Sequence, residues 1–164
     1  MRRMLGLLAA AAMAACAPTG AMPPPDEPAA AGIQAGLRWT ESVSGAGASL
    51  TLLEASGERL LTLACVRDPA LMTVTVERFR AIGSEERLSL GFDDEPFIFV
   101  ADLASPRPVG VEASRPIETG LLDRLVAARE VRAAYGAQML GPHIPPEPAQ
   151  AQRFAAACRQ IAAR

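Results

Sequence analysis

The sequence predicts an α+β protein built mainly from an antiparallel β-sheet, either a sandwich or a strongly curled sheet, with two helices packed on it. Two observations support this fold class. From Trp39 to about Ala113, apolar residues recur at every second position in stretches bounded by Gly, Pro, Asp and Ser. After residue 119 the spacing becomes helical in two further segments, and the second of them reaches the C-terminus.

The predicted strands share an alternation of apolar and polar side chains and are separated by turn sequences such as Ser56-Gly57 and Asp68-Pro69. They are expected at residues 48–54, 59–66, 71–77, 87–92, 96–102 and 109–113. Because the connections are short, consecutive strands are expected to pair as a meander.

A first helix is predicted after Thr119, a candidate N-cap, and is expected to end near Arg129. Its apolar residues follow helical spacing: Leu121, Leu122, Leu125 and Val126. Residues 131–135 alternate again, which predicts one more strand. Residues 141–146 contain three prolines and are expected to be irregular, because proline lacks an N–H and has a fixed φ.

A second helix is predicted to begin near Pro148, since proline suits the first helical turn. One apolar stripe follows the spacing i, i+3, i+4 and i+7: Phe154, Ala157, Cys158 and Ile161. We expect this stripe to pack on the sheet.

The chain begins like an exported protein. Two arginines precede an apolar run over residues 4–15, which is typical of a secretory signal peptide and too short to span a bilayer. The run ends in the sequence MAAC, residues 13–16. This sequence resembles the lipobox of bacterial lipoproteins, with methionine in place of the usual leucine.

The resemblance implies cleavage before Cys16 and acylation of Cys16, which anchors the protein stably in a membrane through more than one lipid chain. Ala17 follows the cysteine, where an aspartate tends to retain such lipoproteins at the inner membrane. The periplasmic face of the outer membrane is therefore favoured over the inner membrane. The alternative is an ordinary cleaved signal peptide whose cleavage site happens to contain a cysteine.

Three parts are predicted along the chain: a signal peptide at 1–15, a tether at 16–36 and one β-rich domain at 37–164. The tether is rich in Pro, Ala and Gly and has few large apolar groups, so it is expected to stay flexible. Without the two signal-peptide arginines the chain keeps 14 basic and 18 acidic residues, a formal net charge of 14 − 18 = −4. This charge argues against a nucleic-acid partner.

Apart from Cys16, the chain has one pair of cysteines, Cys65 and Cys158, each on the predicted buried face of its element. In an oxidising envelope such a pair predicts a disulfide. Two separate buried thiols are the alternative. There is no C-x-x-C sequence of the kind that tunes a reactive thiolate.

The layout of the domain resembles a family of periplasmic proteins, the VasI-like accessory proteins of type VI secretion clusters, and more distantly the invasion-associated locus B proteins. The likeness lies in Trp39, in residues 61–65 (LTLAC), 120–136 and 154–158 (FAAAC). It implies a role in binding or assembly, and it implies no catalytic residues.

Trp39 and His143 are the candidate binding residues. Trp39 is the sole tryptophan and can stack on a ligand, although a tryptophan at the start of a domain more often anchors the core or a sheet edge. His143 is the sole histidine and lies in the proline-rich stretch, where an imidazole can be exposed. One histidine without partners makes neither a typical zinc site nor a triad with an activated serine. We therefore predict no catalytic residue, no metal and no cofactor.

Two charged clusters have structural explanations. Residues 93–95 (DDE) lie between two predicted strands and could supply oxygen ligands to calcium, but the spacing of a calcium loop is missing, so a hairpin turn is favoured. Residues 84–87, with Arg78 and Arg80 nearby in sequence, are interpreted as a solvated charged face.

We therefore expect a lipid-anchored, non-catalytic envelope protein that binds a periplasmic protein or a cell-wall component. Contact is expected at an exposed sheet edge or at the proline-rich stretch around His143. Two alternatives remain: a small periplasmic hydrolase that uses His143, and a structural lipoprotein without a specific ligand.

Overall fold

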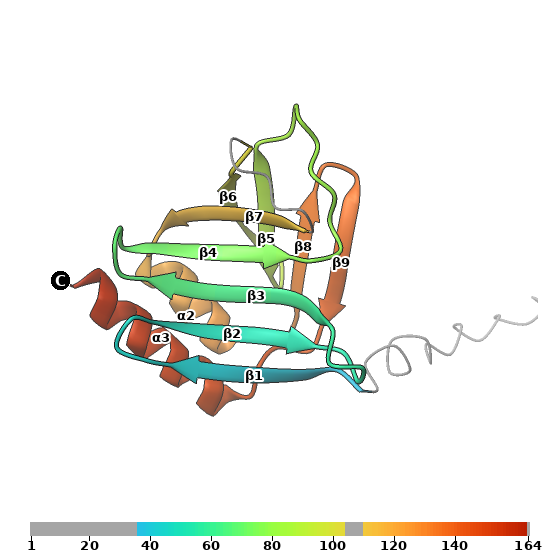
Figure 1. Cartoon of the computed structure of the whole chain (residues 1–164). Helices are drawn as coiled ribbons and strands as arrows, with labels where there is room; N and C mark the ends of the chain where they lie inside the picture. Colours follow the sequence, from blue (N-terminus) through green and yellow to red (C-terminus); the bar gives the residue numbers. More distant parts are fainter. Residues whose placement is uncertain (1–35, 104–109, 164) are drawn as a thin grey trace, which may run out of the picture.

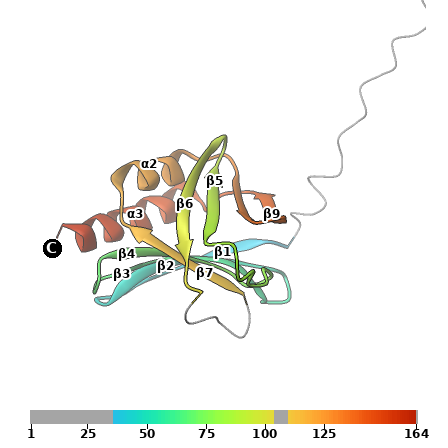
Figure 2. The same cartoon turned by 90° about the horizontal axis from the view of Figure 1, so that it is seen from above.

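The computed structural model describes residues 36–103 and 110–163. The predicted signal peptide, Cys16 and the predicted tether up to residue 35 lie outside the described residues. Within them, one antiparallel sheet of nine strands carries two helices on one side (Figures 1 and 2). The α+β fold class is therefore confirmed, and the sheet is a single curled one rather than a sandwich.

The strands are β1 Arg38–Val43, β2 Gly47–Leu53, β3 Arg59–Val66, β4 Leu71–Val76, β5 Arg87–Phe92, β6 Glu95–Ala101, β7 Val111–Pro116, β8 Val131–Tyr135 and β9 Gln138–His143. The helices are α2 Thr119–Ala127 and α3 Pro148–Ala162. In Figure 1, β1 to β4 and β7 run side by side, whereas β5, β6, β8 and β9 cross them steeply. The sheet curls around the helices but does not close, so β1 and β9 remain as its two edges.

The predicted meander is wrong in one place. The strand order is β1-β2-β3-β4-β7-β6-β5-β8-β9, so β4 pairs with β7 and not with β5. The connection between β4 and β5 packs against the core through Phe79, whose side chain is 3% exposed. The Tyr135 hydroxyl also binds this connection, donating to the Glu85 carbonyl at 2.6 Å and accepting from the Ile82 N–H at 3.3 Å. These contacts join residues about 50 positions apart, which local periodicity cannot reveal.

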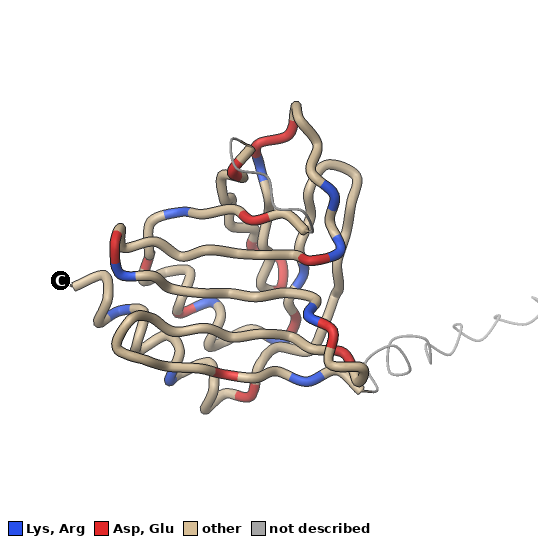
Figure 3. The backbone as a smooth tube through the Cα atoms, viewed as in Figure 1, with Lys and Arg blue, Asp and Glu red and all other residues tan. Residues whose placement is uncertain are grey.

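Alternation along the strands separates a core face from a solvent face. One row of paired residues across β2, β3, β4 and β7 faces the helices and is 0–1% exposed: Leu50, Leu63, Val74 and Ala113. The neighbouring row across β1 to β4 lies on the opposite face and consists of Thr40, Thr51, Thr62 and Thr75. Charged residues gather toward strand ends and turns (Figure 3). The predicted strands are thus confirmed together with their buried faces.

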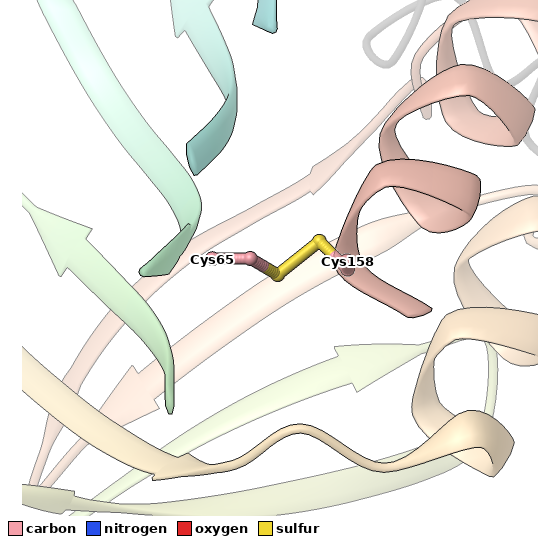
Figure 4. Close-up of a disulfide and its surroundings, with 2 residues drawn as sticks. All are labelled: Cys65 and Cys158. Carbon is pink, nitrogen blue, oxygen red and sulfur yellow. A yellow bond between two sulfur atoms is a disulfide. The ribbon is translucent and has the colours of Figure 1, made fainter. Parts of the chain in front are cut away.

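Helix α3 covers the core face of the sheet with one buried stripe: Ala151, Phe154, Ala155, Cys158 and Ile161. The predicted stripe included Ala157, which is only half-buried, whereas the neighbouring Ala155 is fully buried. Cys158 forms a disulfide with Cys65 at the end of β3, with a Cα–Cα distance of 5.5 Å (Figure 4). The predicted disulfide is therefore present.

Helix α2 differs from its predicted ends by one or two residues. Its N-cap is Glu118, which is extended at φ −117° and ψ 133°, so Thr119 is already helical. Its C-cap is Ala128, whose extended ψ of 144° ends the helix before Arg129. The chain turns there because the Asp93 carboxylate accepts hydrogen bonds from the Arg129 and Glu130 N–H groups at 2.9 and 3.1 Å.

The proline-rich stretch is more regular than predicted. Strand β9 continues through Pro142 to His143, and only the residues after it are irregular. Proline is tolerated because β9 is an edge strand, where a missing N–H breaks no ladder bond. Gly141 has a φ of +91°, and a Cβ there would lie 2.7 Å from the Val131 carbonyl oxygen, so this position requires glycine. The pairing with β8 shifts register at this point.

Candidate functional site

The outer edge of β1, which pairs only with β2 among the described strands, is the first component of the candidate site. In the hairpin to β2, Ser44 and Gly47 exchange both backbone hydrogen bonds. Antiparallel pairs alternate between bonded and non-bonded residues, so Trp39, Glu41 and Val43 point their backbone N–H and C=O groups away from β2. The groups of Glu41 and Val43 form an edge of the kind to which another strand can add, whereas the Trp39 carbonyl accepts a hydrogen bond from α3.

Helix α3 runs along this edge and is fastened to it at two points. The Gln150 amide donates to the Trp39 carbonyl at 3.3 Å. The Arg153 guanidinium forms a forked pair with the Glu41 carboxylate, with an Nη2–Oε2 distance of 2.6 Å and an Nε–Oε2 distance of 3.0 Å. This hydrogen bonding and the charge of Glu41 raise the pKa of Arg153. We call the line where β1 and α3 meet the seam.

Trp39 joins the two edges of the sheet. Its indole Nε1 donates a hydrogen bond of 2.8 Å to the carbonyl of Ile144, the residue that follows β9. The side chain is half-buried against the core. The structure therefore places Trp39 as an anchor between the sheet edges and, at the same time, on the wall of a surface hollow.

Two hollows lie along the seam, one at each end of β1. The first has a volume of about 320 Å³ and is lined by Leu37, Arg38, Trp39, Leu52, Ile144, Pro145, Glu147 and Gln150. The second has a volume of about 400 Å³ and is lined by Glu41, Val43, Arg153, Ala156, Ala157 and Gln160. Both are bounded by β1 on one side and by α3, or the residues leading into it, on the other.

Polar side chains around the first hollow already have internal partners. The side-chain oxygen Oε1 of Gln150 accepts a hydrogen bond from the backbone N–H of Glu147 at 3.2 Å, in a capping box at the start of α3. The Arg38 guanidinium donates to the Glu54 carbonyl at 3.2 Å. The second hollow offers apolar surface, since Val43 is 53% exposed beside two alanines of α3. Both hollows therefore suit apolar side chains presented next to a backbone edge.

The second candidate residue, His143, is buried in the sheet and does not lie in the exposed loop that the sequence predicted. It ends β9 and is 9% exposed, and neither ring nitrogen has a hydrogen-bond partner among the described residues. Burial, together with the positive charge of Arg78, lowers the pKa of His143. It does not line either hollow, but its neighbour Ile144 lines the first one. A hydrolase would need the imidazole to contact a nucleophile or an acid, and no such contact occurs in the described part of the chain.

The two charged clusters have structural roles. Residues 93–95 include the turn between β5 and β6, where Asp93 has a φ of +53° and binds the backbone after α2. Within residues 36–103 and 110–163, no group of three or more His, Cys, Asp or Glu side chains is placed to hold a metal ion. Arg78 forms an ion pair with Glu54, and the Arg80 N–H binds Gln138.

Sequence reasoning found Trp39 but missed Glu41, Val43 and Arg153. The period-two pattern that starts at Trp39 was a usable signal for an edge strand, but the partner of that edge is a helix more than 100 residues away. Neither helix among the described residues is long and apolar enough to cross a membrane. No family model, curated protein or solved structure matches this chain.

Proposed function

We propose that this protein is a lipid-anchored envelope lipoprotein whose domain binds an extended peptide segment of a periplasmic protein along the seam. The observation that carries the proposal is the edge of β1 that no described strand covers, which presents the backbone of Glu41 and Val43 beside two hollows. An added strand gains main-chain hydrogen bonds from the edge, and pockets beside it select alternate side chains.

The dimensions of the seam suit a short segment. Trp39 and Val43 lie four residues apart on β1, which is about 13 Å at about 3.3 Å per residue. A bound peptide of about five residues therefore covers this edge. The pair between Arg153 and Glu41 lies between the two ends of the edge and satisfies both charges. The peptide consequently needs no charged residue at its centre.

Anchoring through Cys16 limits the distance from the membrane at which the domain can bind a partner. Residues 17–36 comprise 20 residues, which at about 3.3–3.6 Å per residue extend to about 70 Å at most. For a partner in the same membrane, or within about 70 Å of it, tethering raises the effective concentration of the partner at the domain. This role agrees with the assembly function that the VasI-like layout implies, and it requires no catalytic group.

Replacing Cys16 with serine is expected to abolish acylation and leave the precursor unprocessed or release the protein into the soluble fraction, because the lipid is attached to the cysteine sulfur. Fractionation and intact mass measure both effects. Met13→Leu is the matched control, since it restores the usual lipobox residue and should keep the mature protein in the membrane. A mature, membrane-bound Cys16→Ser protein would disprove the anchor.

Replacing Val43 with proline is expected to reduce capture of the peptide partner by about tenfold, because proline removes the outward N–H and blocks strand addition. The Val43 N–H points away from β2, so the hairpin keeps its own bonds. A photo-crosslinking residue at Gln160, on the wall of the second hollow, traps the bound protein in cells, and mass spectrometry identifies it.

Val43→Ala is the matched control, because it keeps the backbone donor and should retain most of the capture. Met139→Ala removes an exposed side chain from the opposite edge strand β9 and should also leave capture unchanged. Equal capture by the proline variant, or capture of a cell-wall fragment in place of a protein, would exclude peptide addition at β1. Absence of any specific crosslink would favour the alternative of a structural lipoprotein.

A further inference from the structure

The buried His143 and the residue that binds the indole of Trp39 are neighbours in the chain. His143 is the last residue of β9, and the carbonyl of the next residue, Ile144, accepts the indole hydrogen bond from Trp39. Ile144 and Pro145 then form part of the wall of the first hollow. A change in the position of His143 is therefore transmitted directly to the wall of the candidate site.

The surroundings of His143 accept a neutral imidazole and disfavour a charged one. The side chain is 9% exposed, and both ring nitrogens are without partners among the described residues. Across the sheet, β8 places Val131 opposite His143. The connection after β4 brings the positive charge of Arg78 near the imidazole. Within residues 36–103 and 110–163, no acceptor is therefore in place for a second N–H.

The charged side chains on the packed elements include two ion pairs. Arg78 forms an ion pair with Glu54, and its Nε lies 4.0 Å from Oε1 of Glu58. The two glutamates lie in or beside the turn between β2 and β3. On β8, Arg132 pairs with Glu130. Arg80 follows Arg78 in the same connection and is exposed. Among these charges, Arg78 is the one whose field acts on the imidazole, and its sign opposes protonation.

We propose that His143 is a proton-sensitive latch of the seam: protonation expels its imidazole from the core, moves residues 143–147 away from Trp39 and opens the first hollow. A protonated imidazole carries two N–H donors and a positive charge, and burying both without partners is costly. The open arrangement exposes the imidazole to water and removes this cost. As regulation of peptide binding, the latch rests on the function proposed above.

The direction of the pH effect follows from the lowered pKa of His143 in the closed state. In the open state the imidazole is solvated and its pKa is near the ordinary value of about 6.5. The open state therefore binds the proton more tightly. The closed state keeps its full stability above about pH 6.5 and loses stability as the pH falls below that value toward the lowered pKa.

One spectroscopic experiment tests the latch, because the chain has a single tryptophan and a single histidine. The full-length chain in neutral detergent is titrated from about pH 7.5 to about pH 5 while tryptophan emission and acrylamide quenching are recorded. We expect the emission of Trp39 to shift to longer wavelength and its quenching to increase below about pH 6.5, with unchanged far-UV circular dichroism.

His143→Leu is expected to abolish both changes, because the side chain is apolar and cannot be protonated, while the acidic residues still titrate in that variant. His143→Met serves in its place if the leucine variant does not fold. The same acid-induced shift in the variant, or no shift in the original protein, would overturn the latch. Since this assay contains no partner, its failure is distinguishable from failure of peptide capture at neutral pH by the Val43 variants.

Discussion

Replacing Cys65 and Cys158 together by alanine is expected to lower the free energy of unfolding by about 3–5 kcal/mol. The disulfide joins residues 93 positions apart, so its loss frees a long loop in the unfolded chain. Both cysteines are also buried, at 1% and 0% exposure, so the change leaves a small unfilled volume between β3 and α3. Urea denaturation followed by circular dichroism measures the difference.

Reduction of the original protein is the control for this prediction. It breaks the same bond without changing the side-chain volume, so it should account for most of the loss in stability. Intact mass should increase by two hydrogen atoms upon reduction, because each sulfur gains one electron and one proton. Equal urea midpoints for the oxidised protein, the reduced protein and the double variant would mean that the disulfide contributes nothing to stability.

Replacing Phe154 with alanine is expected to lower the free energy of unfolding by about 3–5 kcal/mol, the usual range for a fully buried aromatic side chain. Phe154 is 0% exposed on the face of α3 that packs on the core, and α3 contacts β1, β2 and β3. An isolated helix of 15 residues is only marginally stable in water. The position of α3, and with it one wall of the seam, therefore depends on this packing.

Gln152→Ala is the matched control for Phe154→Ala. Gln152 lies two positions earlier on the exposed face of the same helix, and its replacement is expected to change stability by no more than about 0.5 kcal/mol. Chemical denaturation of both variants gives the comparison. A loss below about 1 kcal/mol for Phe154→Ala would show that the helix is held chiefly by the disulfide and by the polar contacts of Gln150 and Arg153.

These two predictions also concern function. The disulfide and Phe154 hold α3 against the sheet from inside, whereas the pair between Arg153 and Glu41 holds it at the surface. Without the internal contacts the helix loses its fixed distance from β1, and the hollows at both ends of the edge lose a wall. We therefore expect destabilised variants to lose peptide capture, which is why Val43→Pro, located at the surface, is the sharper test of binding.

Several features of the fold could be predicted because they depend on local order in the sequence. The alternation in residues 48–54 and 59–66 identifies both the strands and their buried faces, since side chains in a strand alternate between its two sides. The helical spacing around Leu121 and Phe154 identifies both helices in the same way. The disulfide was predictable because Cys65 and Cys158 are the remaining pair and both lie on apolar faces.

The candidate site was only partly predictable. Trp39 stands out as the sole tryptophan, and the structure places it on the seam. Its neighbours Glu41 and Val43 could not be assigned to a site, because an edge strand has the same pattern as an inner strand with one polar face. His143 seemed to belong to a loop because of the adjacent prolines, but an edge strand tolerates Pro142 and continues to the histidine.

The sequence by itself determined seven of the nine strands, all but the two edge strands β1 and β9, together with the helices, the pairing of the two cysteines and the features that predict export and anchoring. Each of these is encoded within a short window or by a count of residues. Tertiary structure alone decided that β4 pairs with β7, that α3 lies along the edge of β1, and that His143 is buried at the end of β9. These contacts join segments that are distant in sequence, and they are selected by the burial of one shared core, which no local pattern records.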